Sequence, residues 1–367
     1  MPKVVIGMSG GVDSSVSALL LKQQGYEVIG LYMKNWEELD ASGTCSSQKD
    51  FEDVAKVCEQ IDIPYYTVNF VKEYREHVFE HFLRELKAGN TPNPDILCNR
   101  EIKFKALLDK AIALGADFLA TGHYARVDDH HRLLKGLDPA KDQSYFLYSL
   151  KESTLAKVLF PIGHLEKKEV RAIASRHHLA TSEKKDSTGI CFIGERDFRH
   201  FISHYIPYQP GNFENREGKV IGQHVGVAFY TIGQRKGLAI GGPGDAWFVV
   251  GKDVARNVVI IEQGTDHPAL YAPRLLATQI HWMNHPPPSL PFACHAKIRY
   301  RQADQACRIV SIEGDRVLVE FDQPQRAITP HQSIVFYVGD HCLGGAMIET
   351  AVEEYSFILS DFFLISS

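Results

Sequence analysis

Residues 7–15 read GMSGGVDSS, between a short apolar run at 3–8 and a helical pattern that stops near Gly25. A strand that delivers such a loop into a helix presents backbone N–H groups and the positive end of the helix to an anion. Gly10 and Gly11 let the backbone approach a phosphate closely, and the serines add hydroxyl donors. No lysine follows the glycines, so the string is not a Walker A motif. The stretch predicts a phosphate-binding loop; the alternative is an ordinary tight turn.

Strand-like and helical segments alternate along the first part of the chain. Strands are expected at 27–33, 65–69 and 117–121, and helices at 48–61, 71–88 and 101–114. This alternation predicts a doubly wound α/β domain, in which a parallel sheet carries helices on both faces. Ligands of such domains bind at the carboxyl ends of the strands, which is where the loop at 7–15 would lie.

Beyond about residue 205 the helical periodicity fades, and short strands separated by Gly and Pro replace it. They are expected at 226–232, 246–251, 257–262, 274–282, 293–300, 306–312, 316–321 and 333–339. The later ones are spaced like the strands of a small barrel or sandwich. We expect a doubly wound domain at 1–205, a small β-rich central domain at 206–270 and a C-terminal β-barrel at 271–367. The apolar segment 356–367 is expected to be a packed final strand, with a partner-docking tail as the alternative.

The composition excludes several classes of protein. The 367 residues include 40 Lys and Arg against 45 Asp and Glu, so the formal net charge of −5 rules out a uniformly basic surface. No apolar run reaches the roughly 18–20 residues of a membrane span, and the N-terminus lacks a signal-peptide pattern, so we expect a cytoplasmic protein without a membrane partner. The seven cysteines are an odd number without a Cys-x-x-Cys pair, which argues against a disulfide scaffold or a structural metal site.

Two of these cysteines lie in stretches suited to sulfur chemistry. Cys98 follows two prolines in TPNPDILCN (91–99), which places it and Asp95 where a loop enters a helix. A thiol near a helix N-terminus gains thiolate character, and Asp95 could carry a proton. Cys191 follows two lysines and a turn in KKDSTGIC (184–191), an electropositive setting that also favours a thiolate. Either alone could be a small loop cysteine, but two thiols on loops around one nucleotide pocket suggest sulfur transfer.

Residues 7–15 resemble the PP-loop of the ATP pyrophosphatases, which cleave ATP between the α- and β-phosphates. Taken together, the motifs of the chain resemble the tRNA-specific 2-thiouridylases of that superfamily. They run from residue 7 to about 337: GMSGGVDSS, LYMKNW, TPNPDILCN, ATGHYAR, KDQSYFL, DSTGICFIG, TIGQRKGL, RYRQ and RAITPHQSIVFY. The resemblance implies an ATP-dependent tRNA sulfurtransferase. Such an enzyme adenylates the wobble uridine, places sulfur from a cysteine persulfide at C2 to give 2-thiouridine, and releases AMP and pyrophosphate.

The resemblance also implies roles for individual residues. Cys191 would carry the persulfide, Cys98 would resolve it, and Asp95 would be the general acid/base. Asp13 would lie near Mg²⁺ and the pyrophosphate, and no resident metal site is implied. ATP contacts are implied for Gly7, Met8, Ser9, Gly10, Gly11, Val12, Asp13, Ser14, Met33 and Gly122. Contacts with tRNA are implied for Asn93, Pro94, Asp95, His123, Lys141, Asp142, Gln143, Arg299, Tyr300 and Gln332.

Two basic stretches are candidates for the tRNA surface. Residues 274–308 hold five Lys and Arg against one acid, with Trp282 and Tyr300 interleaved, and residues 166–185 hold six Lys and Arg against three acids. Such stretches suit phosphate contact and base stacking, although either alone could be a solvated face. The expected partners are tRNA and a cysteine desulfurase or sulfur-relay protein that donates the persulfide, and the chain is expected to be a monomer.

Two other functions compete with this interpretation. A different PP-loop enzyme, such as an amidotransferase-type or lysidine-forming ligase, would use ammonia or an amine as nucleophile and would need neither thiol. A non-catalytic RNA-binding module could keep the nucleotide fold in degenerate form, but the intact string at 7–15 argues against it. Dependence of turnover on Cys98 separates the first from a sulfurtransferase, and pyrophosphate release separates the second.

The role of Cys191 gives the first prediction. The variant Cys191→Ser is expected to bind ATP and tRNA as the parent chain does, because serine preserves size and polarity. It is expected to lose thiolation, because a hydroxyl cannot form a persulfide. Mass spectrometry of the digested tRNA measures this, and thiolation by the variant would overturn the assignment.

Overall fold

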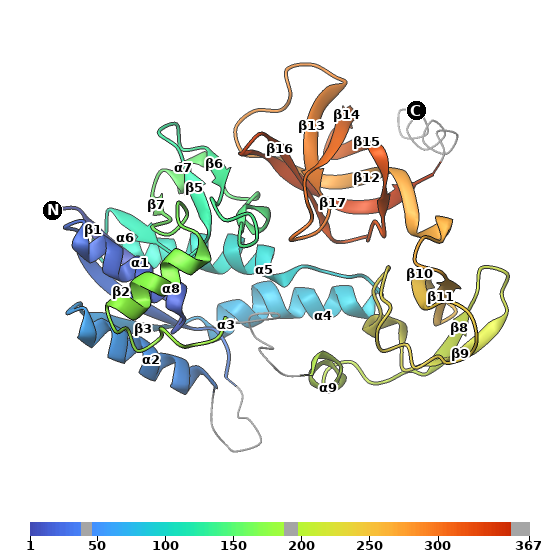
Figure 1. The fold of residues 1–367 in the computed structure, drawn as a ribbon, viewed down its shortest axis with the longest axis horizontal. Helices are drawn as coiled ribbons and strands as arrows, with labels where there is room; N and C mark the ends of the chain where they lie inside the picture. The colour runs from blue at the N-terminus through green and yellow to red at the C-terminus, as the bar shows by residue number, and fades with distance from the viewer. Residues whose placement is uncertain (38–45, 187–196, 354–367) are drawn as a thin grey trace.

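The computed structural model describes residues 1–37, 46–186 and 197–353, and Figure 1 shows three parts in space. The first is built on a parallel sheet of five strands in the order β3-β2-β1-β4-β7. The strands are β1 (Lys3–Met8), β2 (Glu27–Lys34), β3 (Tyr65–Asn69), β4 (Phe118–Ala120) and β7 (Val158–Leu159). The predicted doubly wound α/β domain is therefore confirmed. Within the described ranges, no helix combines the length and apolar character needed to cross a bilayer.

Helices cover both faces of this sheet because its strands are apolar on both sides. In β1, Val4 and Ile6 pack into one core and Val5 packs into the other. The helices on the Val4 side are α1 (Val12–Gln23), α2 (Ser46–Gln60) and α8 (Lys167–Arg176). Those on the Val5 side are α5 (Pro94–Leu97), the π-helical η2 (Cys98–Leu107) and α6 (Leu108–Ala113).

A helical arm connects this domain to the rest of the molecule. It consists of α3 (Val71–Tyr74), the π-helical η1 (Arg75–Phe79) and α4 (Glu80–Lys87). In Figure 1, α4 runs from the parallel sheet toward the two β-rich parts. Its Phe82 and Leu86 pack into one apolar cluster with Phe213 and Phe229 of the central part. The arm therefore shares a core with the central domain.

The central part is a four-stranded sheet in the order β10-β11-β8-β9. It contains β8 (Gly211–Glu214), β9 (Val220–His224), β10 (Trp247–Asp253) and β11 (Val258–Gln263), and α9 (Phe198–Ser203) precedes it. The strand predicted at 226–232 is wrong, since Val227–Phe229 form a single 3₁₀ turn. Gly226 adopts a φ of 142°, which breaks the extended run, and Phe229 and Tyr230 are buried in the cluster shared with α4.

The C-terminal part is a closed six-stranded barrel, as predicted. Its strands are β12 (Tyr271–Trp282), β13 (Phe292–Lys297), β14 (Gln305–Glu313), β15 (Arg316–Arg326), β16 (Ser333–Val338) and β17 (His341–Val352). Pairing of β12 with β17 closes it. The sequence reasoning missed β17, and the final strand predicted at 356–367 lies outside the described residues.

A hairpin of the first domain extends the barrel sheet. Its strands are β5 (Ala125–Val127) and β6 (Leu133–Lys135), and Leu134 of β6 pairs with His341 of β17. A buried ion pair forms nearby, where Lys297 Nζ of β13 lies 3.2 Å from Asp142 Oδ2. The two residues are 8% and 4% exposed. The other oxygen of Asp142 accepts hydrogen bonds from two backbone N–H groups at 3.0 Å. This pair joins the barrel to the α/β domain.

Loss of Lys297 should destabilise the barrel. In Lys297→Met the Asp142 carboxylate stays buried without its cation, which costs about 3 kcal/mol of unfolding free energy. Urea unfolding measures this through Trp282, which stacks on Phe336 in the barrel, with Trp36 and Trp247 replaced by Phe. The matched control is Arg308→Met, also in the barrel, whose pair with Glu320 is 3.8 Å long and exposed, so a loss under about 1 kcal/mol is expected. Equal losses in both variants would contradict this role for the buried pair.

Candidate active site

The loop at residues 9–11 joins β1 to α1 at the carboxyl edge of the sheet. Gly10 has a φ of +75°, and a Cβ on it would lie 2.7 Å from the carbonyl oxygen of Asp50. The hydroxyls of Ser14 and Ser15 donate to the Gly11 carbonyl at 3.1 and 2.8 Å. These contacts fold the first turn of α1 tightly, and the first N–H groups of a helix have no partner inside it. The loop can therefore accept a phosphate oxygen through backbone donors.

A second close approach fixes the other side of the loop. Gly122 follows β4, and a Cβ there would lie 2.8 Å from the backbone nitrogen of Ser14 and 2.9 Å from the Asp13 carbonyl carbon. Real Cβ atoms do not approach so closely, so only glycine lets the two backbones meet. Gly122 thus borders the phosphate loop, as its place among the predicted ATP contacts requires.

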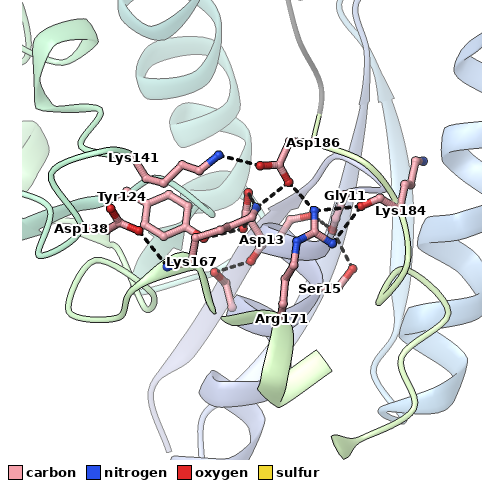
Figure 2. A network of polar contacts seen from close by, with 12 residues as sticks. Gly11, Asp13, Ser15, Tyr124, Asp138, Lys141, Lys167, Arg171, Lys184 and Asp186 are labelled. Atoms are coloured by element: carbon pink, nitrogen blue, oxygen red, sulfur yellow. Dashed lines mark hydrogen bonds and ion pairs between the residues drawn. The ribbon is translucent and has the colours of Figure 1, made fainter. Parts of the chain in front are cut away.

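Asp13, in the first turn of α1, is held by two side chains (Figure 2). Lys167 Nζ lies 2.7 and 2.8 Å from its two oxygens, and Tyr124 donates its hydroxyl to Oδ1 at 2.7 Å. Burial, followed by the nearby Asp13 charge, raises the pKa of Tyr124 far above its ordinary value, so the phenol remains a donor. The Asp13 carboxylate is an oxygen ligand of the kind that Mg²⁺ prefers, and it lies beside the loop that would receive phosphates.

Three cations converge on a second carboxylate, that of Asp186. Lys141, Lys167 and Arg171 contact it at 2.7, 2.8 and 2.6 Å. Burial alone would raise the pKa of Asp186, but hydrogen bonds from Lys141 and Lys167 lower it to about 2. Figure 2 shows Lys167 between Asp13 and Asp186. The result is a compact group of positive charges at the mouth of the phosphate loop.

Part of the basic stretch 166–185 lies beside the phosphate loop in this structure. Lys167 and Arg171 pair as described, and Lys184 pairs with Asp50 and Asp53 of α2 at 2.8 and 2.7 Å. From its charge count alone this stretch was a candidate for the tRNA surface, with a solvated face as the alternative, because a charge count does not show the partners of the charges. Sequence reasoning missed Tyr124, Lys167, Arg171 and Asp186 as site residues. Tyr124 and Asp186 lie inside the quoted motifs ATGHYAR and DSTGICFIG, so a signal for those two was present.

The segment with Asp95 and Cys98 begins a helix. Cys98 therefore lies in a helix, whereas the sequence predicted that it lies on a loop. Pro94 starts α5, and the Asn93 side chain accepts a hydrogen bond from the Asp95 N–H at 3.2 Å. Helical structure continues through η2, so Cys98 lies in its second turn and is 1% exposed. The expectation of a loop thiol failed because the prolines mark the start of this helix, whereas tertiary packing decides burial.

Cys98 nevertheless lies in an apolar cluster that reaches the carboxyl end of β2. It belongs to the apolar cluster shared by α4 and the central domain. Met33, near the carboxyl end of β2, packs against this cluster and also against the core under the sheet. Met33, a predicted ATP contact, and Cys98, a predicted reactive thiol, therefore adjoin the same apolar cluster. Cys191 lies in 187–196, outside the described residues, and Asp186 directly precedes that segment.

Several residues predicted to contact tRNA are buried among protein groups instead. His123 is 8% exposed, lies between Phe104 and Phe160, and its Nδ1 is 2.8 Å from Thr121 Oγ1. Burial lowers the pKa of His123 well below 6.5, so the ring is neutral. Asp142 forms the buried ion pair described above, and Gln143 accepts a hydrogen bond from the Tyr124 N–H at 2.9 Å.

The predicted tRNA contacts of the barrel lie at its junction with the α/β domain. The ring of Tyr300 is 4.4 Å from that of Phe146, measured between centroids. Gln332 donates from Nε2 to the Thr91 carbonyl at 2.6 Å, and Arg299 donates to the Ala327 carbonyl. Of these side chains, Gln332 contacts the loop that leads to Asn93, and all three are engaged with protein groups.

The parallel sheet with a phosphate loop after its first strand is typical of nucleotide-binding α/β domains. In this chain a small β domain and a closed barrel follow it. The family model described as "tRNA methyl transferase HUP domain" matches residues 2–195. The models "tRNA methyl transferase PRC-barrel domain" and "Aminomethyltransferase beta-barrel domain" match residues 199–263 and 273–348. These three matches follow one another along most of the chain.

Curated relatives agree with these matches. The tRNA-specific 2-thiouridylase MnmA of Protochlamydia amoebophila is 61% identical over 350 residues, which cover 94% of this chain and 93% of that one. The protein of the same name from Shouchella clausii is 57% identical over 350 residues, covering 95% and 96%. A solved structure, the U34-tRNA thiolase NcsA from Methanococcus maripaludis, overlaps 56% of this chain and 65% of its own, at 22% identity and a TM-score of 0.35. The chain belongs to the tRNA-specific 2-thiouridylase family and is an enzyme of that family.

The close approach at Gly122 gives a prediction about nucleotide binding. In Gly122→Ala the added methyl displaces the first turn of α1, and overpacking of about 1–3 kcal/mol corresponds to roughly a ten- to hundredfold weaker affinity for ATP. Titration calorimetry with a non-hydrolysable ATP analogue measures this. The control is Gly241→Ala, whose Cβ would meet nothing within 4 Å and whose affinity should not change. Unchanged affinity in Gly122→Ala would show that nucleotide does not bind against this turn.

Proposed function

We propose that this enzyme uses ATP to convert the wobble uridine of tRNA to 2-thiouridine. One observation carries the proposal: the phosphate loop with its cations lies at the carboxyl edge of the sheet, and Met33, near the same edge on β2, packs against the cluster that holds Cys98. An activated base and a sulfur nucleophile must meet within a few ångströms, and this edge can hold both. High identity to named 2-thiouridylases supports the same reaction.

In the first half-reaction, O2 of the uridine attacks the α-phosphate of ATP, and pyrophosphate leaves. A uridine oxygen is a poor leaving group, whereas AMP is a good one. The N–H groups of the loop and the side chains of Lys167 and Arg171 would hold the β- and γ-phosphates and stabilise the charge that develops on pyrophosphate. Asp13 would hold Mg²⁺, which neutralises phosphate charge when bound.

In the second half-reaction, a persulfide on Cys191 supplies the sulfur. Its terminal sulfur attacks C2, AMP leaves with O2, and the base becomes linked to Cys191 through a disulfide bond. The Cys98 thiolate then attacks the Cys191 sulfur, which forms a Cys98–Cys191 disulfide and releases 2-thiouridine; an external thiol must reduce this disulfide before the next turnover. Cys98 could instead first release the terminal sulfur as hydrosulfide, with the same products. Asp95, in the first turn of α5, would accept or return the proton.

The remaining roles follow from this reaction. The residues proposed to contact tRNA are Asn93, Pro94, Asp95, His123, Lys141, Asp142, Gln143, Arg299, Tyr300 and Gln332. Because several are occupied by protein contacts here, tRNA would exchange those contacts for its own. A cysteine desulfurase or relay protein would load Cys191.

We assign the chain to the cytoplasm as a monomer, with domains at 1–205, 206–270 and 271–367.

The test is a single reaction with several readouts. The enzyme is incubated with ATP, Mg²⁺, a persulfide donor and unmodified tRNA; pyrophosphate is measured, and the digested tRNA is analysed by mass spectrometry. We expect sulfur in place of oxygen at the wobble uridine, together with pyrophosphate. Cys98→Ala should abolish multiple turnovers. The matched control is Cys58→Ala, a thiol buried on α2 whose pKa burial raises to about 12, and it should remain active.

Other outcomes identify other functions. Pyrophosphate release without sulfur in the RNA, unaffected by loss of Cys98, would indicate a PP-loop enzyme with an amine nucleophile. Binding of tRNA without pyrophosphate release would indicate a non-catalytic RNA-binding module. Either result would overturn the proposed sulfur transfer.

A further inference from the structure

The turn between α4 and the segment with Asp95 and Cys98 is held from two sides. It spans residues 88–91, and the helix that carries Cys98 begins at Pro94. One side is contacted by β10 of the central domain and the other by the loop between β15 and β16 of the barrel. Figure 1 shows the end of α4 between these two β-rich parts. The central domain and the barrel therefore both contact one short turn, which precedes the helix that carries Cys98.

The central domain contributes Lys252 to this contact. Its Nζ donates to the Gly89 carbonyl at 2.7 Å, and burial lowers the pKa of Lys252 to about 8. In the described part of the chain no carboxylate forms an ion pair with Lys252, so a partly buried ammonium is directed at a backbone oxygen. Val254 lies against the same turn, since a Cβ on Gly89 would be 2.4 Å from its Cγ2. Gly89 also has a φ of +78°.

The barrel contributes His331 and Gln332. His331 Nδ1 lies 2.7 Å from Glu85 Oε2 on α4, and the same oxygen accepts from Asn90 Nδ2 at 2.8 Å. Gln332 Nε2 donates to the Thr91 carbonyl at 2.6 Å. His331 adopts a φ of 64°, which turns its side chain toward α4 at the end of a loop. Two consecutive barrel residues therefore fix both ends of the turn.

The apolar packing behind the turn also connects the central domain to the segment that carries Cys98. Leu86 of α4, Cys98 and Ile102 share one cluster with Val249 and Val259 of the central domain. A shift of the central domain or the barrel relative to α4 would therefore move the turn, and a shift of the turn would change the packing around Cys98. The thiol is 1% exposed in this arrangement, so it must be uncovered before it can react.

We propose that Lys252 and the His331–Glu85 pair are positioning residues that hold Cys98 in its buried position until tRNA changes the arrangement of the two β domains. The inference rests on the proposed function in one respect, namely that Cys98 reacts during turnover. Neither Lys252 nor His331 touches the reacting atoms in this role. Their contacts set how often the segment opens, and tRNA bound across both β domains would supply the free energy to open it.

The test measures the exposure of Cys98 directly in the full chain without tRNA or ATP. Iodoacetamide labelling of Cys98 is followed by peptide mass spectrometry in Lys252→Met and His331→Asn; asparagine tolerates the positive φ. Labelling should accelerate about tenfold or more, because loss of a hydrogen bond to a charged group shifts a local opening equilibrium by that order. The matched controls are the exposed Lys219→Met in the central domain and His285→Asn in the barrel, which should label like the parent.

Two further readouts separate positioning from general loosening. The labelling rates of the buried Cys58 and Cys342 should not change in any variant, because neither lies near the turn. In thiolation assays the KM for tRNA should fall in Lys252→Met, because less of the free energy of tRNA binding is used to open the segment, while kcat stays within about twofold. Unchanged labelling of Cys98 in both variants, or equal acceleration at all three thiols, would overturn the proposal. Labelling does not require turnover, so failure of the proposed sulfur transfer would be recognised separately.

Discussion

The ammonium of Lys167 lies between the carboxylates of Asp13 and Asp186, and the arrangement of the phosphate site depends on this contact. Its side chain is 12% exposed, so the charge must be paired where it stands. The Asp13–Lys167 pair joins the first turn of α1 to the first turn of α8, although 154 positions separate the two residues in the chain. The Lys167–Asp186 pair joins α8 to the segment that follows Lys184. The cations that would meet a polyphosphate are therefore already in place, which reduces the reorganisation needed when nucleotide binds.

The cost of leaving a buried polar or charged group unpaired also explains why predicted tRNA contacts lie in protein interfaces. A polar side chain between domains needs a partner whether or not RNA is present, because an unsatisfied buried donor or acceptor is costly. Gln332 meets that need at the Thr91 carbonyl, and Lys297 meets it at Asp142. Contacts of this kind connect the barrel to the segment that carries Cys98. The barrel and the segment that carries Cys98 are thus physically linked in this fold.

The sequence pattern predicted the structure correctly where interactions between residues close in sequence determine the element. The strand predicted at 65–69 coincides with β3, and the helix predicted at 48–61 lies within two residues of α2 at each end, because their apolar periodicity and turn residues act over a few positions. The segment 226–232 has the apolar pattern of a strand but packs as a 3₁₀ turn against α4. β17 escaped prediction because Gly344 and Gly345 interrupt its pattern, although both meet neighbouring strands closely in the barrel.

The sequence by itself determined the doubly wound domain, the phosphate loop, the β-rich remainder and the pairing of Asp95 with Cys98 on one short segment. Those features follow from residue types at short spacing, where backbone geometry leaves few choices. Tertiary structure alone decided that Lys167, Arg171 and Asp186 surround the loop, that Cys98 is buried, and that both β domains hold the turn at 88–91. Charge pairing and burial depend on side chains far apart in sequence, and only the folded chain brings them within contact distance.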